Sequence, residues 1–261
     1  MNIPPEAKIL IVDIETAPML AYLYGMYDQS IGVEQVVAHK YILSVACKWA
    51  HEDTLYYIDQ RNRLDLEDDK PILEWLMPFF EEANIVVGQN SERFDIRTIN
   101  ARIEYHQMKR YSDFRQQDTK KIAKKNFDLP SYSLAYMGEY FQLKNRKTTH
   151  TKFSGFSLWR EIVLNKNQEA FAEMEVYNKQ DVLTTEELWK RLVKWDDKVS
   201  YSVYSEDAMP KCDCGCLDLR KNGFRWKNKG KYQRYSCFDC GKPVIGKDNL
   251  LTKLKKSEIL V

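Results

Sequence analysis

The sequence predicts an α/β domain with a mixed β-sheet flanked by helices, followed by a small cysteine-rich module. Three observations carry this prediction. β-rich segments come first along the chain and then alternate with helical ones, an order typical of such sheets. Five of the six cysteines lie between Cys212 and Cys240. The length of 261 residues suffices for one sizeable α/β domain and a small accessory unit.

The first half of the chain predicts three neighbouring strands and then alternating helices and strands. An apolar strand over 8–14 ends in acidic residues, and two β-rich segments follow closely enough to form a meander with it. Helical spacing over 71–83 predicts a helix, which Pro78 is expected to end or kink. The other elements of this half are expected at 41–49 and 54–58 (the two β-rich segments), 84–87 (a strand) and 92–106 (a helix).

In the second half, one long helix over 167–195 is the clearest element, because its apolar residues recur at helical intervals. The other expected elements are a strand at 115–119, helical pieces over 120–140 broken at Pro130, and a polar, basic loop at 145–157. That loop contains His150 and either touches a substrate backbone or is plain surface. The chain is therefore expected to divide into a domain over 1–200, a linker over 201–209 and a module over 210–261.

Charge is distributed unevenly along the chain. Residues 209–261 contain 13 Lys and Arg and 5 Asp and Glu, a net charge of +8, whereas the preceding residues contain 27 and 33, a net charge of −6. A basic tail suggests a polyanionic partner or, alternatively, a solvated surface. We find no apolar run long enough for a membrane span and no secretory signal. We therefore expect residence in the cytoplasm, of a prokaryotic or phage-infected cell.

Acidic residues stand at the edges of three predicted elements. Asp13 and Glu15 are two residues apart on the first strand and therefore point to the same face. Asp95 begins a helix, and Asp181 follows Tyr177 by one helical turn. Carboxylates that converge on a cleft can hold two divalent cations, which activate water and stabilise a leaving alkoxide in phosphodiester hydrolysis. Taken singly, each acid is also compatible with an ordinary residue at the end of a strand or helix.

Together the three segments resemble the motifs of the DnaQ-like, or DEDD, 3′→5′ exonucleases of the RNase H-like superfamily. The first segment begins at Asp13 and reads DIET (D-x-E-T), and the second, over 88–95, reads GQNSERFD, close to N-x-x-x-F-D. The third, over 177–181, reads YNKQD (Y-x-x-x-D), and its tyrosine marks the DEDDy branch. The resemblance covers about residues 6–195 and implies an RNase H-like fold. The GQN of the second segment departs from the commoner GHN, a difference expected to have little effect.

The resemblance also implies roles for individual residues. Two Mg²⁺ or Mn²⁺ ions would be bound, with Asp13 as the chief bridging ligand, although Glu15 could also bridge. The expected metal ligands are Asp13, Glu15, Asp95 and Asp181. Tyr177 would orient the attacking water, because a phenol with a pKa of about 10 is a poor general base. The residues expected to contact the substrate 3′ end are Thr16, Asn90 and Phe94.

The clustered cysteines predict one structural zinc ion, because in a reducing compartment such clusters bind metal rather than form disulfides. Cys237 and Cys240 form a C-x-x-C-G pattern, in which two thiolates reach one ion and the glycine permits the tight turn. The upstream half-site, KCDCGC, offers three cysteines for the two remaining positions. Cys214 is followed by glycine as Cys240 is, which favours Cys212 with Cys214. Cys216 is the alternative ligand.

Basic and aromatic residues are interleaved between the two half-sites. This segment looks like the hairpin of zinc ribbons found in some transposases and phage nucleic-acid proteins. Cations would neutralise phosphates and rings would stack on bases, whereas a zinc-stapled module with no ligand is the alternative. The residues expected to contact nucleic acid are Arg225, Trp226, Lys229, Lys231, Tyr232 and Arg234.

These features predict a metal-dependent 3′→5′ exonuclease that hydrolyses the terminal phosphodiester bond of DNA, favours single-stranded 3′ ends and releases nucleoside 5′-monophosphates. Two alternatives remain open. RNA could be the substrate, because nothing in the sequence is seen to read the 2′-hydroxyl. The chain could also be a non-catalytic nucleic-acid adaptor with a degenerate nuclease fold, although the complete set of four acids argues against it.

Overall fold

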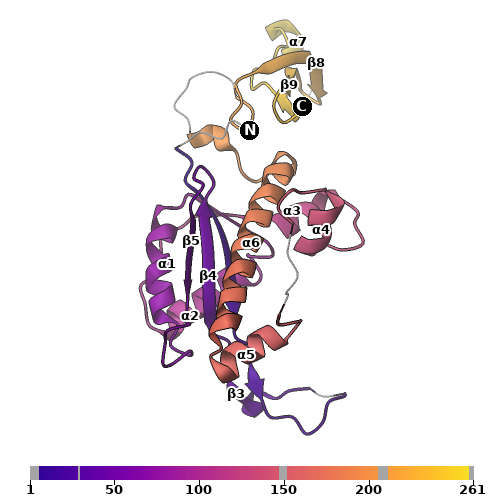
Figure 1. Ribbon diagram of the computed structural model, residues 1–261. Helices are drawn as coiled ribbons and strands as arrows, with labels where there is room; N and C mark the ends of the chain where they lie inside the picture. Colours follow the sequence, from indigo (N-terminus) through magenta and orange to yellow (C-terminus); the bar gives the residue numbers. More distant parts are fainter. Residues whose placement is uncertain (1–5, 29, 147–151, 205–210, 259–261) are drawn as a thin grey trace. The chain divides into compact units, whose positions relative to one another are not determined.

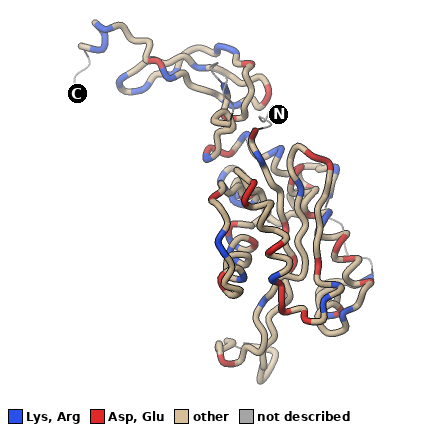
Figure 2. The backbone as a smooth tube through the Cα atoms, turned by 90° about the vertical axis from the view of Figure 1, so that its left-hand side faces the viewer, with Lys and Arg blue, Asp and Glu red and all other residues tan. Residues whose placement is uncertain are grey.

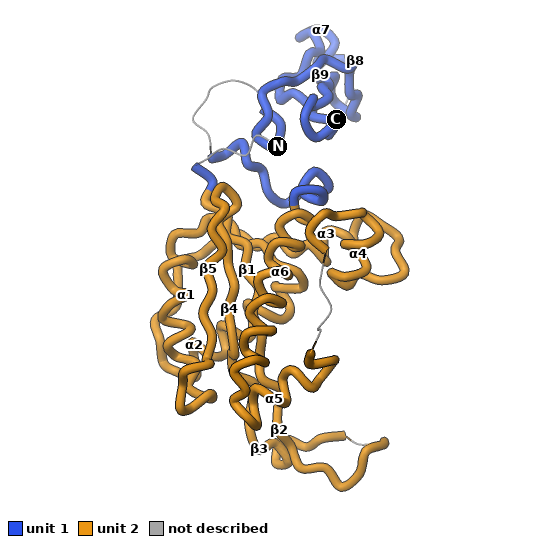
Figure 3. The backbone as a smooth tube through the Cα atoms, in the orientation of Figure 1, with its two compact units in different colours: residues 1–7, 190–261 blue, residues 8–189 orange. Residues whose placement is uncertain are grey.

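The computed structural model describes residues 6–28, 30–146, 152–204 and 211–258. His150 and parts of the expected loop and linker therefore lie outside the described residues. The chain divides into two compact units (Figure 3). The sheet unit comprises residues 8–189, and the cysteine unit comprises residues 1–7 and 190–261.

Within the described residues, the sheet unit contains a five-stranded sheet with the order β5-β4-β1-β6-β7. β1 (Ile9–Thr16) pairs antiparallel with β4 (Ile42–Trp49), which pairs antiparallel with β5 (Leu55–Asp59). On its other side β1 pairs parallel with β6 (Ile85–Gly88), and β6 pairs parallel with β7 (Arg115–Asp118). The expected mixed sheet, with its initial meander, is confirmed.

Helices cover both faces of this sheet (Figure 1). α1 (Lys70–Glu82) and α2 (Asp95–Tyr105) pack on one face, where alternate residues of β1 and β4 join the apolar core. The opposite face lies against α6 (Gln168–Leu192), where Asn178 accepts a hydrogen bond from the hydroxyl of Ser44 on β4. Because side chains alternate along a strand, β1 directs apolar residues to the first layer and its two acids to the second.

Three shorter α-helices are also present in the described part of the sheet unit. α3 (Thr119–Asn126) and α4 (Leu134–Tyr140) are separated by the segment that contains Pro130, as expected. α5 (Ser157–Asn165), which the sequence did not indicate, packs its buried side chains into one apolar cluster with Phe171 of α6. None of the helices in the described residues has the length and apolar composition that crossing a membrane requires.

α1 does not end at Pro78, one of the two outcomes expected there, but continues to Glu82. Proline removes one backbone N–H from the helix and leaves the carbonyl of Glu74 without its usual partner. Glu74 is exposed, so water can reach this carbonyl. Two residues after the proline, Phe80 is fully buried in the core. That burial contributes about 1.5–3 kcal/mol, which offsets much of the cost of about 3 kcal/mol for an interior proline.

A short hairpin of β2 (Leu20–Ala21) and β3 (Val36–Ala38) projects from the end of β1 (Figure 1). This hairpin was not expected from the sequence. A hydrogen bond from the backbone N–H of Ala17 to the carbonyl of Tyr41, at 2.9 Å, closes its base. The closure holds the residues between β3 and β4 beside the start of the hairpin.

The cysteine unit contains the expected hairpin. β8 (Leu219–Lys227) pairs antiparallel with β9 (Gly230–Cys237), and β10 (Pro243–Ile245) pairs with the other side of β9. A short helix, α7 (Lys253–Ser257), follows. Tyr201, the first residue of the expected linker, is buried, and its backbone N–H donates to the carbonyl of Asp213 at 2.7 Å. The beginning of that linker is therefore packed into this unit.

Candidate active site and cysteine cluster

Asp13, Glu15 and Asp181 meet on the α6 face of the sheet. Each offers a carboxylate oxygen, and these oxygens lie within 4.8 Å of one another. Asp181 is 5% exposed, whereas Asp13 and Glu15 are half-buried and accessible to solvent. Three like charges at this separation destabilise one another unless cations or protons neutralise them. Hard oxygen donors in an accessible cluster fit Mg²⁺ or Mn²⁺.

Asn178 sets the orientation of the Asp13 carboxylate. Its side-chain amide donates to Asp13 Oδ2 at 2.6 Å and to the Asp13 carbonyl at 3.2 Å. Asn178 is fully buried, and its side-chain oxygen Oδ1 accepts a hydrogen bond from Ser44 Oγ at 3.0 Å. Sequence reasoning treated position 178 as variable and missed this role. The available signal was an amide on the same buried face of α6 as Asp181.

Asp95 approaches β1 from the opposite layer, at the start of α2. Its Oδ1 accepts the backbone N–H of Ile14 at 3.1 Å. This N–H is available because β6 pairs with β1 only as far as Ile11. Asp95 is 3% exposed, and burial raises its pKa to about 7. The carboxyl is therefore tied to the backbone between Asp13 and Glu15, and it is not one of the three groups that lie within 4.8 Å.

Asp118, at the end of β7, fastens the turn that precedes Asp95. Its carboxylate accepts the backbone N–H of Asn90 at 3.0 Å and of Glu92 at 3.3 Å, and it also caps the first turn of α3. Asn90 has a φ of 64°, a left-handed conformation that asparagine tolerates better than most residues. Burial raises the pKa of Asp118. Sequence reasoning gave Asp118 no role, although an acid directly before a helical segment is an N-cap signal.

Gln89, where the second motif departs from the family pattern, links this turn to the segment after β7. Its amide donates to the carbonyl of Tyr132 at 2.9 Å and its side-chain oxygen accepts from the Thr119 hydroxyl. The preceding Gly88 has no room for a side chain, since a Cβ there would lie 2.5 Å from the Cβ of Ser91. Gly88 and Gln89 therefore shape the turn that leads to Asp95.

The remaining expected residues lie around these acids. Tyr177 stands one turn before Asp181 on α6. Its half-buried ring meets the ring of Trp159 edge to face, with 6.2 Å between the ring centres. Thr16 follows Glu15 at an irregularity in the pairing of β1 with β4. Phe94 directly precedes α2, with the Nζ atom of a lysine 5.2 Å from its ring centre. All three motifs thus converge on the ends of β1 and β6.

In the cysteine unit, four thiols gather as the sequence favoured. The sulfur atoms of Cys212, Cys214, Cys237 and Cys240 lie within 4.8 Å of one another. A hydrogen bond between Cys212 and Cys214 lowers the pKa of Cys212 and raises the pKa of Cys214, as expected of closely packed thiols that share a proton. Cys216 is not a member of this group, and its Sγ lies 3.9 Å from the carbonyl of Asp218. Four sulfur donors at this spacing are compatible with one tetrahedral zinc ion.

The thiols are also the core of their unit. Cys212, Cys214, Cys216 and Cys237 are at most 5% exposed. Leu219, Val244 and the partly buried Cys240 pack against them. Gly215 and Gly241, at the two turns, have φ values of 87° and 71°, which glycine adopts without strain. The two half-sites therefore share the same turn chemistry.

The hairpin distributes its basic and aromatic residues over two faces. Trp226 pairs with Lys231, and Arg225 pairs with Tyr232. Paired residues share a face and successive residues alternate, so these two pairs lie on opposite faces. Arg234 is two residues from Tyr232 on β9 and therefore lies on the same face as Tyr232. Lys229 lies in the turn between the strands. Lys and Arg are frequent along this unit (Figure 2), yet one face presents only part of the expected set.

The profile of a family described as the RNase_H superfamily matches residues 10–193. Among solved structures, the chain is similar to the family B DNA polymerase from the hyperthermophilic archaeon Pyrobaculum calidifontis, with 15% sequence identity and a TM-score of 0.52. The similarity covers 73% of this chain and 25% of the polymerase chain, and it concerns the fold alone. No curated protein matches the sequence.

Proposed function

The chain belongs to the RNase H superfamily, and from this premise we propose that its sheet unit is a metal-dependent 3′→5′ exonuclease of the DEDDy type. The observation that supports this proposal is the group of carboxylate oxygens from Asp13, Glu15 and Asp181 within 4.8 Å. An adaptor with a degenerate fold would have no need of three like charges at this separation.

Each residue of the site has a proposed role. Asp13, Glu15 and Asp181 supply oxygen ligands, and Asn178 keeps Asp13 aligned with them. Asp95 holds the backbone at Ile14 in place and is the fourth ligand implied by the motif. Divalent cations, when bound, lower the pKa of a water and stabilise charge that develops on the phosphate. Tyr177 directs the attacking water through its hydroxyl.

The proposed reaction removes one nucleotide at a time. Water attacks the phosphorus of the terminal phosphodiester, and the bond from phosphorus to the 3′ oxygen of the preceding nucleotide breaks. The preceding 3′ oxygen takes up a proton, and the water oxygen remains on the released phosphate. The products are a nucleoside 5′-monophosphate and a strand shortened by one residue.

Hydrolysis of end-labelled strands tests the proposal. Matched DNA and RNA strands, single- and double-stranded and labelled at the 5′ end, are incubated with Mg²⁺, with Mn²⁺ or without added divalent ion. We expect a ladder of shortened labelled products and mononucleotide release, which phosphorothioate linkages at the 3′ end should slow. Metal-independent cleavage, internal cleavage, or no cleavage by the wild-type protein would overturn it.

We propose DNA as the first substrate to test. RNA remains the second candidate. The matched strands in this experiment decide between them through their relative initial rates.

We further propose that the cysteine unit binds one structural Zn²⁺ and contacts nucleic acid through one face of its hairpin. Because Trp226 and Arg225 lie on opposite faces of the hairpin, each face can be tested separately. The variants Trp226→Ala/Lys231→Ala and Arg225→Ala/Tyr232→Ala each remove one ring and one cation. The variant of the contacting face should bind single strands more weakly and with a shallower salt dependence. Unchanged binding by both variants would refute contact by the hairpin.

A further inference from the structure

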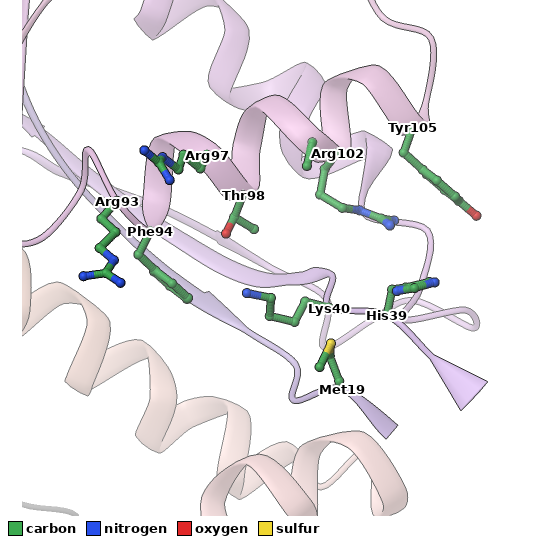
Figure 4. A pocket seen from close by; sticks show the side chains of 10 residues that line it. Met19, His39, Lys40, Arg93, Phe94, Arg97, Thr98, Arg102 and Tyr105 are labelled. Carbon is green, nitrogen blue, oxygen red and sulfur yellow. The ribbon is translucent and has the colours of Figure 1, made fainter. Parts of the chain in front are cut away.

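The sheet unit contains a basic pocket beside the start of α2, outside the carboxylate cluster. The pocket has a volume of about 390 Å³ and is lined by α2, the turn before it and the base of the β2–β3 hairpin. Arg93 and Arg97 stand at one end, Tyr105 stands at the other, and Phe94 and Lys40 lie between them (Figure 4). Phe94 directly precedes Asp95, and Met19 and Lys40 lie next to the paired ends of β1 and β4, so the pocket lies at the same end of the sheet as the two acids of β1.

Three of the cations at this pocket, Arg93, Arg97 and Lys40, have no acidic partner among the residues that the structure describes. In the part of the chain that the structure describes, Arg93 and Arg97 form no ion pair, and none of the residues that line the pocket is acidic. Lys40 contacts the Phe94 ring rather than a carboxylate. Arg102 is different, because its Nε lies 2.8 Å from Oδ2 of the buried Asp69. Uncompensated cations on a concave surface produce a positive potential that attracts anionic groups.

The pocket also offers aromatic surface. Tyr105 is 68% exposed, and the Arg102 guanidinium carbon lies 4.2 Å from its ring centre. Phe94 is half-buried at the pocket wall. Cations that contact a phosphate backbone, together with rings on which bases stack, are the combination by which proteins bind single strands.

We propose that this pocket binds one unpaired nucleotide of the substrate strand, upstream of the residue that is removed. This inference rests on the proposed exonuclease function. Arg93 and Arg97 contact phosphates, and the base packs against Tyr105 or Phe94. The volume lies within the range of about 300–1,000 Å³ of small-ligand pockets, which suits one nucleotide and not a stacked duplex. The strand must therefore be unpaired where it passes α2.

Binding measured without cleavage tests this site. The full chain carrying Asp13→Ala is titrated with fluorescein-labelled dT12 at several salt concentrations in Mg²⁺, and affinity is read by anisotropy. Adding Arg93→Ala/Arg97→Ala should weaken binding about tenfold and reduce the slope of log K against log salt by about 1.4, since each phosphate contact on a single strand contributes about 0.7. Adding Tyr105→Leu should weaken binding about tenfold through lost stacking, with the salt slope unchanged.

Two controls isolate the pocket. Arg110→Ala removes an exposed arginine that pairs with Asp113, so both affinity and slope should match the parent. A blunt hairpin duplex should bind the parent and the pocket variants equally. Parental affinity and slope for dT12 in the Arg93→Ala/Arg97→Ala variant would overturn the proposal. Failure of the wild-type protein to hydrolyse any strand would instead reject the exonuclease function, because this binding assay does not depend on hydrolysis.

Discussion

The carboxylate cluster and the thiol cluster differ in what surrounds them. Asp13 and Glu15 end a strand whose preceding four residues are buried, and this strand lies in a sheet with helices on both faces. Most of the cysteines, in contrast, are themselves the buried core of their unit. The core of the sheet unit therefore packs without the carboxylates. In the cysteine unit, the cysteines themselves take the place of an apolar core.

This difference predicts different consequences of metal loss. A large apolar core holds the sheet unit together, so the metal ions proposed for it would be needed for chemistry and not for folding. Small units with little apolar core depend on metals or other cross-links, and structural zinc binding is worth about 10–16 kcal/mol in zinc-finger peptides. Four substitutions test this difference, and each is followed by the hydrolysis rate of a short oligonucleotide.

The largest effect is expected from Asp13→Ala. Asp13 belongs to the three-carboxylate group and is fixed by Asn178. Removing a single group that stabilises charge in a transition state already costs about 10²–10³-fold, and loss of a metal ligand should bring hydrolysis below detection. Thermal unfolding of the sheet unit should be unchanged or occur at a higher temperature, because a like charge is removed. Asp113→Ala, at an exposed ion pair, is the control, and normal hydrolysis by Asp13→Ala would refute the metal site.

Tyr177→Phe should produce the next largest effect. A positioned acid–base or water-orienting group contributes roughly 10²–10⁴-fold, so the single-turnover rate at saturating substrate should fall by that range while substrate affinity is retained. Tyr140, 57% exposed on α4, provides the matched control in Tyr140→Phe. An unchanged single-turnover rate would reduce Tyr177 to a packing residue against Trp159.

The residues that local pattern could identify are those whose position follows from one element. Alternation along β1 placed Asp13 and Glu15 on one face, and one helical turn placed Asp181 beside Tyr177. The turn chemistry shared by Cys214 and Cys240 favoured the four thiols that the structure brings together. The mixed sheet followed from the order of elements in the same way.

Contacts between distant elements could not be read from such patterns. Asn178 contacts Asp13, 165 residues away in the sequence. The hydrogen bond between Asp95 and the backbone of Ile14 depends on how far β6 pairs with β1. Which basic and aromatic residues share a face with Trp226 and which with Arg225 depends on the pairing of β8 with β9. Continuation of α1 through Pro78 depends on the burial of Phe80 in a core built from the whole sheet.

Asn178→Ala tests one of these distant contacts, with a smaller expected effect. Partners that orient metal ligands typically change metal affinity or activity by about 10–100-fold. We therefore expect the Mg²⁺ concentration for half-maximal hydrolysis to rise within that range, with partial recovery of the rate at high Mg²⁺. Asn165→Ala, at an exposed residue of α5, is the control. A lower rate with an unchanged Mg²⁺ requirement would mean that Asn178 has only a packing role.

Loss of zinc should have the smallest effect on hydrolysis, although it affects the cysteine unit most. Cys237→Ser removes a member of the four-thiol group, whereas Cys216→Ser alters a buried cysteine outside it. Metal analysis should find about one zinc per chain in the wild-type protein and in Cys216→Ser, and a reduced content in Cys237→Ser. Cys237→Ser should expose the cysteine unit to proteolysis and weaken binding of long strands, yet hydrolyse a short oligonucleotide at the wild-type rate. Zinc loss in Cys216→Ser would mean that the ligand set is wrong. Loss of short-substrate hydrolysis in Cys237→Ser would show that the carboxylate site depends on the thiol-centred unit, and the contrast between the two sites would fail.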